Sequence, residues 1–389
     1  MGIIGAGPAG LLLANALRQA GVDCVLVERH SRAHVEARAR AGVIEQRTVE
    51  LLDGYGLAGP LLATGARHGS CEFRHRGGRF SVPYGELTGG RTHFVYPQQS
   101  LVRDLAEAYL AGGGQLLFSH PARALDGLTG DRPVLRCAPA DGDGPELAIE
   151  CDYVAGCDGS YGIARRSVPT GGLREYGRQH EWGWLAVLAE TPPATEQIIY
   201  ALHQEGFAGH MLRTPTVSRF YLQCPVGDSP ENWPDERIWS ALHRRLDLTA
   251  DELRPGPITE RTVLEMRSLV VEPMRYGRLF LAGDAAHIIT PAGAKGMNLA
   301  IADAHELAER LIARCRGADA AVLDGYSDAR LPRIWQAQEF SHWFLQLLHS
   351  PVAEPADAAF LHRLRVSRLS QLQGSTPFAG LFARQYVGG

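Results

Sequence analysis

Three glycines near the start of the chain constrain its fold more than any other feature. Gly5, Gly7 and Gly10 have G-x-G-x-x-G spacing, and Glu28 follows at the end of the next apolar run. Such glycines let the backbone approach a pyrophosphate at a helix N-terminus, and such a carboxylate accepts a hydrogen bond from a ribose hydroxyl. The pattern predicts a βαβ unit that binds a dinucleotide, within a parallel sheet covered by helices.

Hydrophobic periodicity predicts the remaining elements. Apolar residues recur at helical spacing in segments 11–20, 101–111, 238–246, 297–314 and 330–348. Residues 115–155 alternate in apolar character and predict a β meander. Residues 181–225 are rich in strand-forming runs and predict a separate antiparallel sheet.

Composition narrows the class of protein. The 389 residues carry a net charge of −4, without the basic bias of chains that bind nucleic acid or anionic membranes. No apolar run is long enough to span a membrane. Seven scattered cysteines without a C-x-x-C pair predict reduced thiols and a cytoplasmic protein, and the histidines lack metal-ligand spacing. Only four residues precede Gly5, which leaves open whether this end is complete.

Two later segments indicate which dinucleotide is bound. A strand ends in Asp158-Gly159, and another ends in Gly283-Asp284. An aspartate at such an edge can accept from a ribityl or ribose hydroxyl. The glycine-rich residues 293–298 then lead into a helix. The start of that helix offers backbone N–H groups suited to the electron-rich side of a reduced isoalloxazine.

These three segments, in this order, resemble the class A flavoprotein aromatic hydroxylases. Segments 38–46, 96–98, 270–274 and 386–388 are similar to the para-hydroxybenzoate hydroxylase group of that family. The resemblance covers nearly the whole chain. It implies FAD as cofactor, NAD(P)H as reductant, O2 and a small aromatic acid as substrates, and a homodimer without nucleic-acid or membrane partners.

The elements and the resemblance together predict an α/β (α+β) fold. It comprises a Rossmann-like FAD-binding domain with a parallel sheet, an antiparallel-sheet substrate domain and a C-terminal helical interface region. The predicted boundaries are 1–70, 96–180 and 268–345 for the first domain, 71–95 and 181–267 for the second, and 346–389 for the third.

The resemblance also assigns cofactor contacts. Glu28 holds the adenosine ribose, Asp284 holds the ribityl chain, and Arg219 positions the flavin between two orientations. The full set of FAD contacts is Gly5, Gly7, Gly10, Glu28, Arg40, Gln98, Asp158, Arg219, Asp284, Met297 and Asn298. Contacts to NAD(P)H are Arg38, Arg267 and Tyr161, the last in place of a family histidine. A basic cluster at 29–34 either holds a 2′-phosphate or is a solvated face, so NADPH and NADH both stay open.

Substrate contacts follow from the same resemblance. Hydroxylation by a flavin is an electrophilic substitution, so the phenol must lose its proton in the site. Tyr200, Tyr386 and His68 match the hydroxyl relay that removes it, and the Pro291 carbonyl faces the phenol. Arg213 suits a carboxylate through a bidentate guanidinium, with Tyr221 as a second contact. The ring is lined by Val43, Trp184, Ile198, Met211, Ala292 and Ala294.

Two departures from the family pattern leave the substrate open. Met211 replaces a serine that donates to the carboxylate, and a thioether cannot donate. Ala292 replaces a threonine beside Pro291 and gives more room near the phenol edge. One hypothesis is conversion of 4-hydroxybenzoate to 3,4-dihydroxybenzoate. The other is hydroxylation of a ring-substituted analogue such as 3-amino-4-hydroxybenzoate.

Three other functions are open to a chain with this flavin fold. Trp182-Gly-Trp184 resembles the start of a flavin-dependent halogenase motif, but Leu185 and the residues after it break the motif. The set Tyr200, Arg213 and Tyr386 disfavours a flavin-dependent dehydrogenase of the same fold, and the complete relay of Tyr200, Tyr386 and His68 disfavours a non-catalytic flavoprotein.

Overall fold

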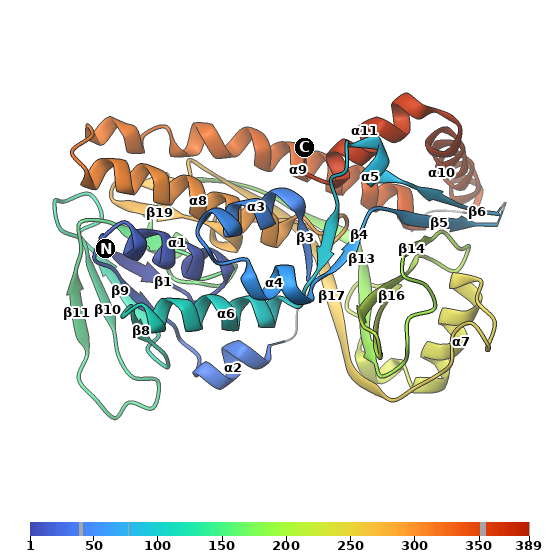
Figure 1. Ribbon diagram of the computed structural model, residues 1–389, viewed down its shortest axis with the longest axis horizontal. Coiled ribbons are helices and arrows are strands. Elements are labelled where there is room, and N and C mark those ends of the chain that lie inside the picture. Colours follow the sequence, from blue (N-terminus) through green and yellow to red (C-terminus); the bar gives the residue numbers. More distant parts are fainter. Residues whose placement is uncertain (39–41, 77, 351–354, 389) are drawn as a thin grey trace.

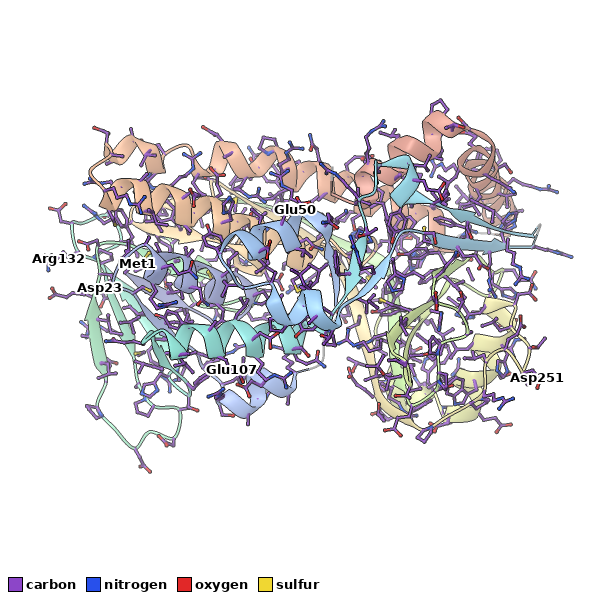
Figure 2. All side chains as sticks on the ribbon, viewed as in Figure 1. Met1, Asp23, Glu50, Glu107, Arg132 and Asp251 are labelled. Atoms are coloured by element: carbon purple, nitrogen blue, oxygen red, sulfur yellow. The ribbon has the colours of Figure 1, made fainter. Side chains whose placement is uncertain are left out.

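The computed structural model describes residues 1–38, 42–76, 78–350 and 355–388. Two lobes lie side by side, one built on a nucleotide-binding type of sheet and one on a larger sheet, and long C-terminal helices run along one edge (Figure 1). Met1 donates to the Asp23 carbonyl at 2.8 Å at the end of the first lobe, far from Asp251 in the second (Figure 2).

A six-stranded sheet forms the first lobe. Its order is β18 (Arg275–Tyr276), β19 (Leu279–Leu281), β12 (Val154–Gly156), β1 (Gly2–Ile4), β2 (Val25–Val27) and β8 (Gln115–Leu117). All neighbours pair in parallel except β18 with β19. The central strands are apolar and buried on both faces, as is typical of a parallel sheet. The predicted parallel sheet is therefore confirmed.

Helices pack on this sheet through apolar stripes. The helix α1 (Pro8–Gln19) contacts α6 (Gln98–Ala111) and α8 (Gly296–Cys315). These match three of the predicted helices. Shorter helices complete the lobe: α2 (Arg32–Ala37), α3 (Gln46–Gly54), α4 (Gly59–Thr64) and the 3-10 turns Arg165–Ser167, Gly283–Ala285 and Ala320–Leu323.

The predicted meander over 115–155 is only partly correct. Its antiparallel sheet comprises β9 (Ala122–Asp126), β10 (Val134–Cys137) and β11 (Leu147–Glu150). Residues 115–117 instead form β8, which pairs in parallel with β2 at the edge of the main sheet. Alternation of apolar residues sets the face that a strand buries but does not choose its partner.

An eight-stranded sheet forms the second lobe. Its order is β20 (His287–Ile288), β17 (Ile258–Glu272), β13 (Arg174–Ala189), β16 (Val217–Pro225), β15 (Ala208–Thr214), β14 (Ile198–Ala201), β5 (Cys71–His75) and β6 (Gly78–Val82). All pairs are antiparallel except β14 with β5. The long strands β13 and β17 pair from Arg174 with Glu272 to Ala189 with Ile258.

Helices cover both faces of this second sheet and create two cores. The helix α7 (Asp235–Leu246) packs on one face, together with the 3-10 turn Pro230–Asn232. On the other face lie α9 (Tyr326–Leu348), α10 (Pro355–Gly374), α11 (Thr376–Tyr386) and α5 (Tyr84–Leu87). A short sheet of β3 (Val43–Glu45), β7 (His93–Val95) and β4 (Ala66–His68) lies where the two lobes meet.

None of the helices in the described ranges is long and apolar enough to cross a membrane.

Candidate active site

The glycine fingerprint forms an open turn before α1. A Cβ at Gly5, whose φ is +100°, would overlap the Cys157 carbonyl, and a Cβ at Gly10 would overlap the Gly5 carbonyl. Gly7 caps α1 without a side-chain hydrogen bond, and nothing lies within 4 Å of where its Cβ would be. Backbone N–H groups at the helix start therefore face open space, which fits a pyrophosphate.

Glu28 is buried at the end of β2, beside this turn. Its Oε2 atom accepts from the Ala6 N–H at 2.8 Å and its Oε1 atom accepts from the His30 N–H at 2.9 Å. These two bonds fix the carboxylate against the β1–α1 turn, and each oxygen keeps a lone pair for a ribose hydroxyl.

Asp158 lies at the carboxyl end of β12. Its Oδ2 atom accepts from the Ala164 N–H at 2.8 Å, while its buried Oδ1 atom has no hydrogen-bond partner among the residues that the structure describes. Burial raises the pKa of this carboxyl. A buried oxygen without a partner is costly, and a ligand hydroxyl would satisfy it. The glycine turn, Glu28 and Asp158 thus fit a dinucleotide cofactor.

A buried ionic network holds the Gly283-Asp284 turn. Asp303 of α8 accepts from the Gly283 N–H at 3.0 Å, from His287 Nε2 at 2.6 Å and from Arg330 Nε at 2.7 Å. Burial alone would raise the pKa of Asp303, but the contacts with His287 and Arg330 lower it to about 2. The network fixes the backbone from which Asp284 extends.

Two of the three predicted relay residues meet. Tyr200 of β14 and Tyr386, the last residue of α11, lie with their hydroxyl oxygens 2.8 Å apart. Burial raises the pKa of both phenols well above the ordinary value of 10. Both therefore stay neutral at physiological pH, which suits groups that pass a proton rather than hold a charge.

His68 does not join this pair directly. Within the described residues its Nε2 atom has no hydrogen-bond partner, and burial lowers the pKa of its ring. Its carbonyl accepts from the Tyr84 hydroxyl at 2.9 Å, and the Tyr84 ring lies 5.1 Å from that of Tyr386. Tyr84 therefore contacts both the backbone of His68 and the ring of Tyr386.

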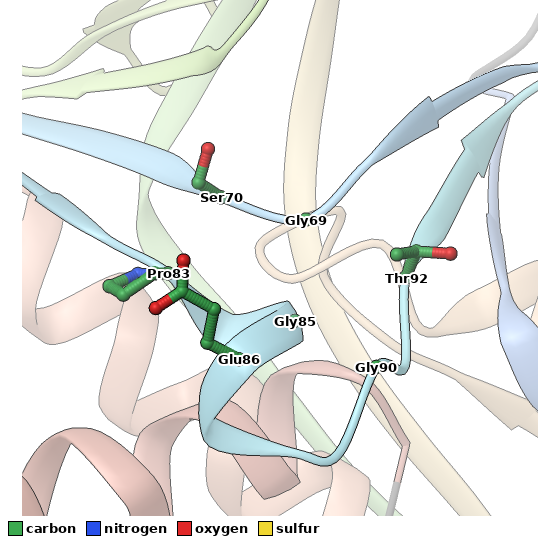
Figure 3. A pocket seen from close by; sticks show the side chains of 7 residues that line it. All are labelled: Gly69, Ser70, Pro83, Gly85, Glu86, Gly90 and Thr92. Carbon is green, nitrogen blue, oxygen red and sulfur yellow. The ribbon is translucent and has the colours of Figure 1, made fainter.

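A hollow begins one residue after His68. It has a volume of ≈ 440 Å³. Figure 3 shows the turn at Gly69 and Ser70 facing Pro83 and α5, which carries Gly85 and Glu86. Its lining residues are Gly69, Ser70, Pro83, Gly85, Glu86, Gly90 and Thr92. This hollow places solvent-accessible space next to the predicted outer end of the relay.

Arg213 reaches from β15 to the first lobe. Its Nη2 atom donates to Gln99 Oε1 at 3.0 Å, and a Cβ at Gly42 would lie 2.8 Å from its Nη1 atom. Burial, reinforced by nearby Arg219, lowers the pKa of the guanidinium to about 10. A buried cation at the junction of two lobes suits an anionic ligand.

Arg219 and Tyr221 lie on β16, next to β15 in the sheet. Met211 is paired with Arg219 in the ladder, and Gly209 with Tyr221. The Arg219 guanidinium lies 5.9 Å from the Tyr221 ring centroid, and its Nη2 atom lies 3.4 Å from Glu260 Oε1. Neighbouring strands thus carry the residues predicted to contact the carboxylate and the flavin.

The predicted ring walls share one apolar core. Val43, Trp184, Ile198, Met211 and Ala292 are all buried in the cluster that contains Tyr386, and Tyr200, Tyr221 and Ala294 pack against it. These residues come from β3, β13, β14, β15 and the loop before α8. Residues that are distant in the sequence therefore meet in one apolar core.

The loop before α8 is a tight turn. The Pro291 carbonyl accepts from the Ala294 N–H at 3.0 Å, and Ala294 has a φ of +56°. One lone pair of the Pro291 oxygen is therefore already used, and the second stays available to a phenol.

No motif in the sequence indicates a buried ion pair that lies beside the two tyrosines. Lys295 Nζ donates to Glu45 Oε1 at 2.6 Å and to the Tyr386 carbonyl at 2.7 Å. Asn298 accepts from the Glu45 N–H at 3.0 Å and donates to the Val43 carbonyl at 3.2 Å. These contacts tie β3, the start of α8 and the C-terminal helix together. Met297 lies between them on α8, partly buried against the core of the first lobe.

The predicted NAD(P)H residues are partly brought together. The Arg267 guanidinium lies 4.7 Å from the ring centroid of Tyr161, a side chain that is 69% exposed. Arg38 is exposed after α2. Gln98 begins α6, and Arg40 lies outside the described residues. In the basic cluster, Arg32 pairs with Glu36 at 2.6 Å, so part of its charge is already neutralised.

Comparison with known proteins identifies the family. Residues 1–341 match the family described as FAD binding domain. The chain is 39% identical to p-hydroxybenzoate hydroxylase of Acinetobacter baylyi over 388 residues, covering 99% of this chain and 94% of that enzyme. It is 27% identical to 6-methylpretetramide 4-monooxygenase of Streptomyces rimosus, covering 93% of this chain and 65% of that enzyme.

Solved structures agree with these relatives. The aromatic hydroxylase CabE from angucycline biosynthesis superposes with a TM-score of 0.78 at 26% identity, covering 100% of this chain and 75% of that one. The p-nitrophenol 4-monooxygenase of Pseudomonas putida shares the fold with a TM-score of 0.84 at 21% identity, covering 100% of this chain and 98% of that one. The predicted fold, the cofactors FAD and NAD(P)H and the hydroxylase class are confirmed. The chain therefore belongs to the FAD binding domain family, as an FAD-dependent aromatic hydroxylase related to p-hydroxybenzoate hydroxylase.

Proposed function

We propose that this enzyme hydroxylates a 4-hydroxybenzoate-type phenol ortho to a ring substituent. The observation that carries the proposal is the Tyr200–Tyr386 hydroxyl pair, 2.8 Å apart, in the same core as the apolar ring walls. Arg213 supplies the buried cation that such an acid needs. The identity of 39% with p-hydroxybenzoate hydroxylase supports the same substrate class.

The protein's residues bind, orient and deprotonate the acid. When bound, reduced FAD supplies electrophilic oxygen from O2. Arg213 and Tyr221 hold the carboxylate, which sets the phenol toward Tyr200. Tyr200 accepts the phenolic proton as its own hydroxyl proton moves to Tyr386, and Tyr386 in turn passes its hydroxyl proton outward to solvent, so that no tyrosinate forms. The apolar walls exclude water from the ring.

The fingerprint turn, Glu28 and Asp158 would hold the adenosine half of FAD, and Asp284 with residues 297–298 would hold the flavin half. The orphaned Asp158 oxygen and the open turn at Gly7 support this assignment. Residues 1–70, 96–180 and 268–345 then form the FAD-binding part, and 71–95 with 181–267 the substrate part. The strands β13 and β17 run through both parts.

A second candidate substrate is a ring-substituted acid such as 3-amino-4-hydroxybenzoate. Met211 and Ala292 favour it, because both are buried in the pocket core and neither can donate a side-chain hydrogen bond. The small Ala292 leaves room for a substituent beside the phenol.

Turnover of the two acids in parallel tests both candidates. FAD-loaded protein is given NAD(P)H and either 4-hydroxybenzoate or 3-amino-4-hydroxybenzoate, and the product is identified by mass and NMR. Coupled turnover of 4-hydroxybenzoate alone supports the first candidate. Preference for the substituted acid makes Met211 and Ala292 specificity determinants, and M211S/A292T should then shift the preference back. Turnover of neither acid overturns the proposed substrate class.

We further propose a homodimer. Three apolar side chains on α10, Phe360, Leu361 and Leu364, are exposed in the single chain, and 346–389 is the predicted interface region. Light scattering of the FAD-loaded protein tests this, and a monomer at micromolar concentration would contradict it.

A further inference from the structure

A buried histidine follows directly after α9. His349 is 1% exposed, and its ring is packed among three aromatic side chains of the second lobe. The ring centroids lie 5.7 Å from Trp184, at an interplanar angle of 11°, and 5.3 Å from both Trp182 and Phe207. Of these three, Trp184 is also a predicted wall of the substrate ring.

The hydrogen bonds of His349 define its tautomer. Its Nδ1 atom lies 2.8 Å from the Leu345 carbonyl, which can only accept, so Nδ1 carries the proton. The indole N–H of Trp184 can only donate, and it lies 2.5 Å from Nε2. Nε2 is therefore the acceptor. Burial lowers the pKa of His349 to about 3, so the ring is neutral at physiological pH.

The backbone around His349 is anchored independently of Trp184. Arg365 Nη1 donates to the His349 carbonyl at 2.5 Å. The Ser350 carbonyl accepts from Trp182 Nε1 at 2.8 Å and from Gln223 Nε2 at 2.9 Å. These hydrogen bonds hold the backbone carbonyls of His349 and Ser350 in place, so the Nε2 atom of His349 is an acceptor in a fixed position.

The indole of Trp184 also packs beside predicted substrate residues. The Trp184 ring lies 4.8 Å from the Tyr221 ring and 5.0 Å from Phe207, and it belongs to the core that holds Met211. A rotation of this indole would change the space between Trp184 and Tyr221. Nothing else in the described part of the chain accepts the indole N–H.

We propose that His349 is a positioning residue that locks the Trp184 indole through the Nε2 acceptor and so sets the shape of the aromatic-acid pocket. The effect on substrate rests on the proposed function, whereas the lock on the indole does not. The hydrogen bond from Trp184 to His349 thereby connects the C-terminal helices to the substrate site, although the two residues lie far apart in the sequence.

The substitutions separate the hydrogen bond from packing. H349F keeps a ring of similar size and removes the acceptor, whereas H349Q keeps an acceptor near the position of Nε2. W335F is a matched control, because it removes another indole hydrogen bond, the one from Trp335 to Glu272, and the Trp335 ring packs on Tyr176 rather than on His349 or Trp184. All proteins are loaded with FAD before measurement.

The first measurement reports the indole without any substrate. Trp184 fluorescence and near-UV circular dichroism are assigned by difference from W184F. H349F should change the Trp184 signal, H349Q should restore most of it, and W335F should leave it unchanged. An unchanged Trp184 signal in H349F overturns the proposal. An equal change in H349F and H349Q also overturns it, because packing rather than the acceptor would then be responsible.

The second measurement is turnover of the acid that the wild-type enzyme prefers. We expect H349F to raise KM about tenfold, the penalty for one buried donor without an acceptor, with a smaller change in kcat. In a W184F background, H349F should add no further rise, because no indole N–H remains. That double variant also stays informative if H349F folds poorly. A rise that persists without Trp184 contradicts the proposal. If the wild type turns over neither acid, the substrate class fails while the spectroscopic test still decides on the lock.

Discussion

At the scale of single residues, the site depends on a few polar groups placed in an apolar core. Arg213 brings a positive charge to the junction of the lobes. The neutral side chain of Gln99 accepts a hydrogen bond from its guanidinium at 3.0 Å. Tyr200 and Tyr386 bring hydroxyls that burial keeps neutral. Because these groups have different roles, removal of one should affect one step, substrate binding or deprotonation, more than the others.

Replacement of Arg213 by lysine should weaken substrate binding. A lysine keeps the charge but cannot make a bidentate contact, so the Kd for the aromatic acid should rise by about 10- to 100-fold. The Kd is measured from the change in flavin absorbance on titration with the acid. Arg166, an exposed arginine of the first lobe, provides a control in R166K, which should bind normally. Unchanged affinity in R213K would show that the carboxylate binds elsewhere.

Replacement of Tyr200 by phenylalanine should break the proton path. The variant keeps the ring packing and loses the hydroxyl that lies 2.8 Å from Tyr386. The bound phenol should then ionise at a higher pH than in the wild type, because the stabilising hydrogen bond to the phenolate is gone. Product formation should fall about 100-fold or more while NAD(P)H oxidation continues.

Ultraviolet difference spectra of the bound acid between pH 6 and 10 follow the ionisation. Y84F is a suitable control, since the Tyr84 hydroxyl donates to the His68 carbonyl rather than to the Tyr200 or Tyr386 hydroxyl. A phenol that ionises at the same pH in Y200F and in the wild type would exclude Tyr200 from the relay.

At the scale of elements, buried ion pairs join helices to strand ends. Asp303 of α8 links the Gly283 turn, His287 of β20 and Arg330 of α9, and Lys295 before α8 links β3 to the C-terminal helix. Breaking such a pair leaves a buried charge without compensation, which is far more costly than the loss of a surface pair.

The substitution D303N should destabilise the fold and loosen FAD. Loss of the carboxylate leaves Arg330 uncompensated, at a cost of about 3–5 kcal/mol. The pKa of Asp303 in the folded protein is lowered to about 2 from 3.8. The ionised carboxylate therefore adds to the free energy of unfolding above pH 4, and this stabilisation is lost as the pH falls from about 4 to 2. The stability of the D303N variant should therefore fall less than that of the wild type between pH 4 and pH 2.

Thermal melts from pH 2 to 7, with and without added FAD, measure both effects. E306Q on the same helix removes only the surface pair with Arg310 and should change stability by less than about 0.5 kcal/mol. Equal melting temperatures for D303N and the wild type at pH 7 would contradict a structural role for the network.

At the scale of the whole molecule, the sequence predicted most of the architecture and part of the site. Periodicity located α1, α6, α7, α8 and α9, because long apolar stripes depend little on tertiary context. It failed for β8, because the choice of a strand partner is not encoded in alternation.

The site residues that sequence reasoning missed share one cause. Gln99, Lys295 with Glu45, and His349 each act through a partner that is distant in the sequence. Their own neighbourhoods carry no motif, so only the packing of the lobes reveals them. His68 makes no hydrogen bond to either tyrosine among the described residues, and Tyr84 contacts both the His68 carbonyl and the Tyr386 ring.

Incorporation of labelled oxygen tests the central claim most directly. FAD-loaded enzyme is given NAD(P)H, the preferred 4-hydroxybenzoate-type acid and ¹⁸O2, and the product is analysed by mass spectrometry. We predict one ¹⁸O atom in the product for each NAD(P)H consumed, because one oxygen atom enters the ring and the other leaves as water. A product without the label, or NAD(P)H oxidation that yields only hydrogen peroxide, would contradict the assignment of this chain as a hydroxylase of such acids.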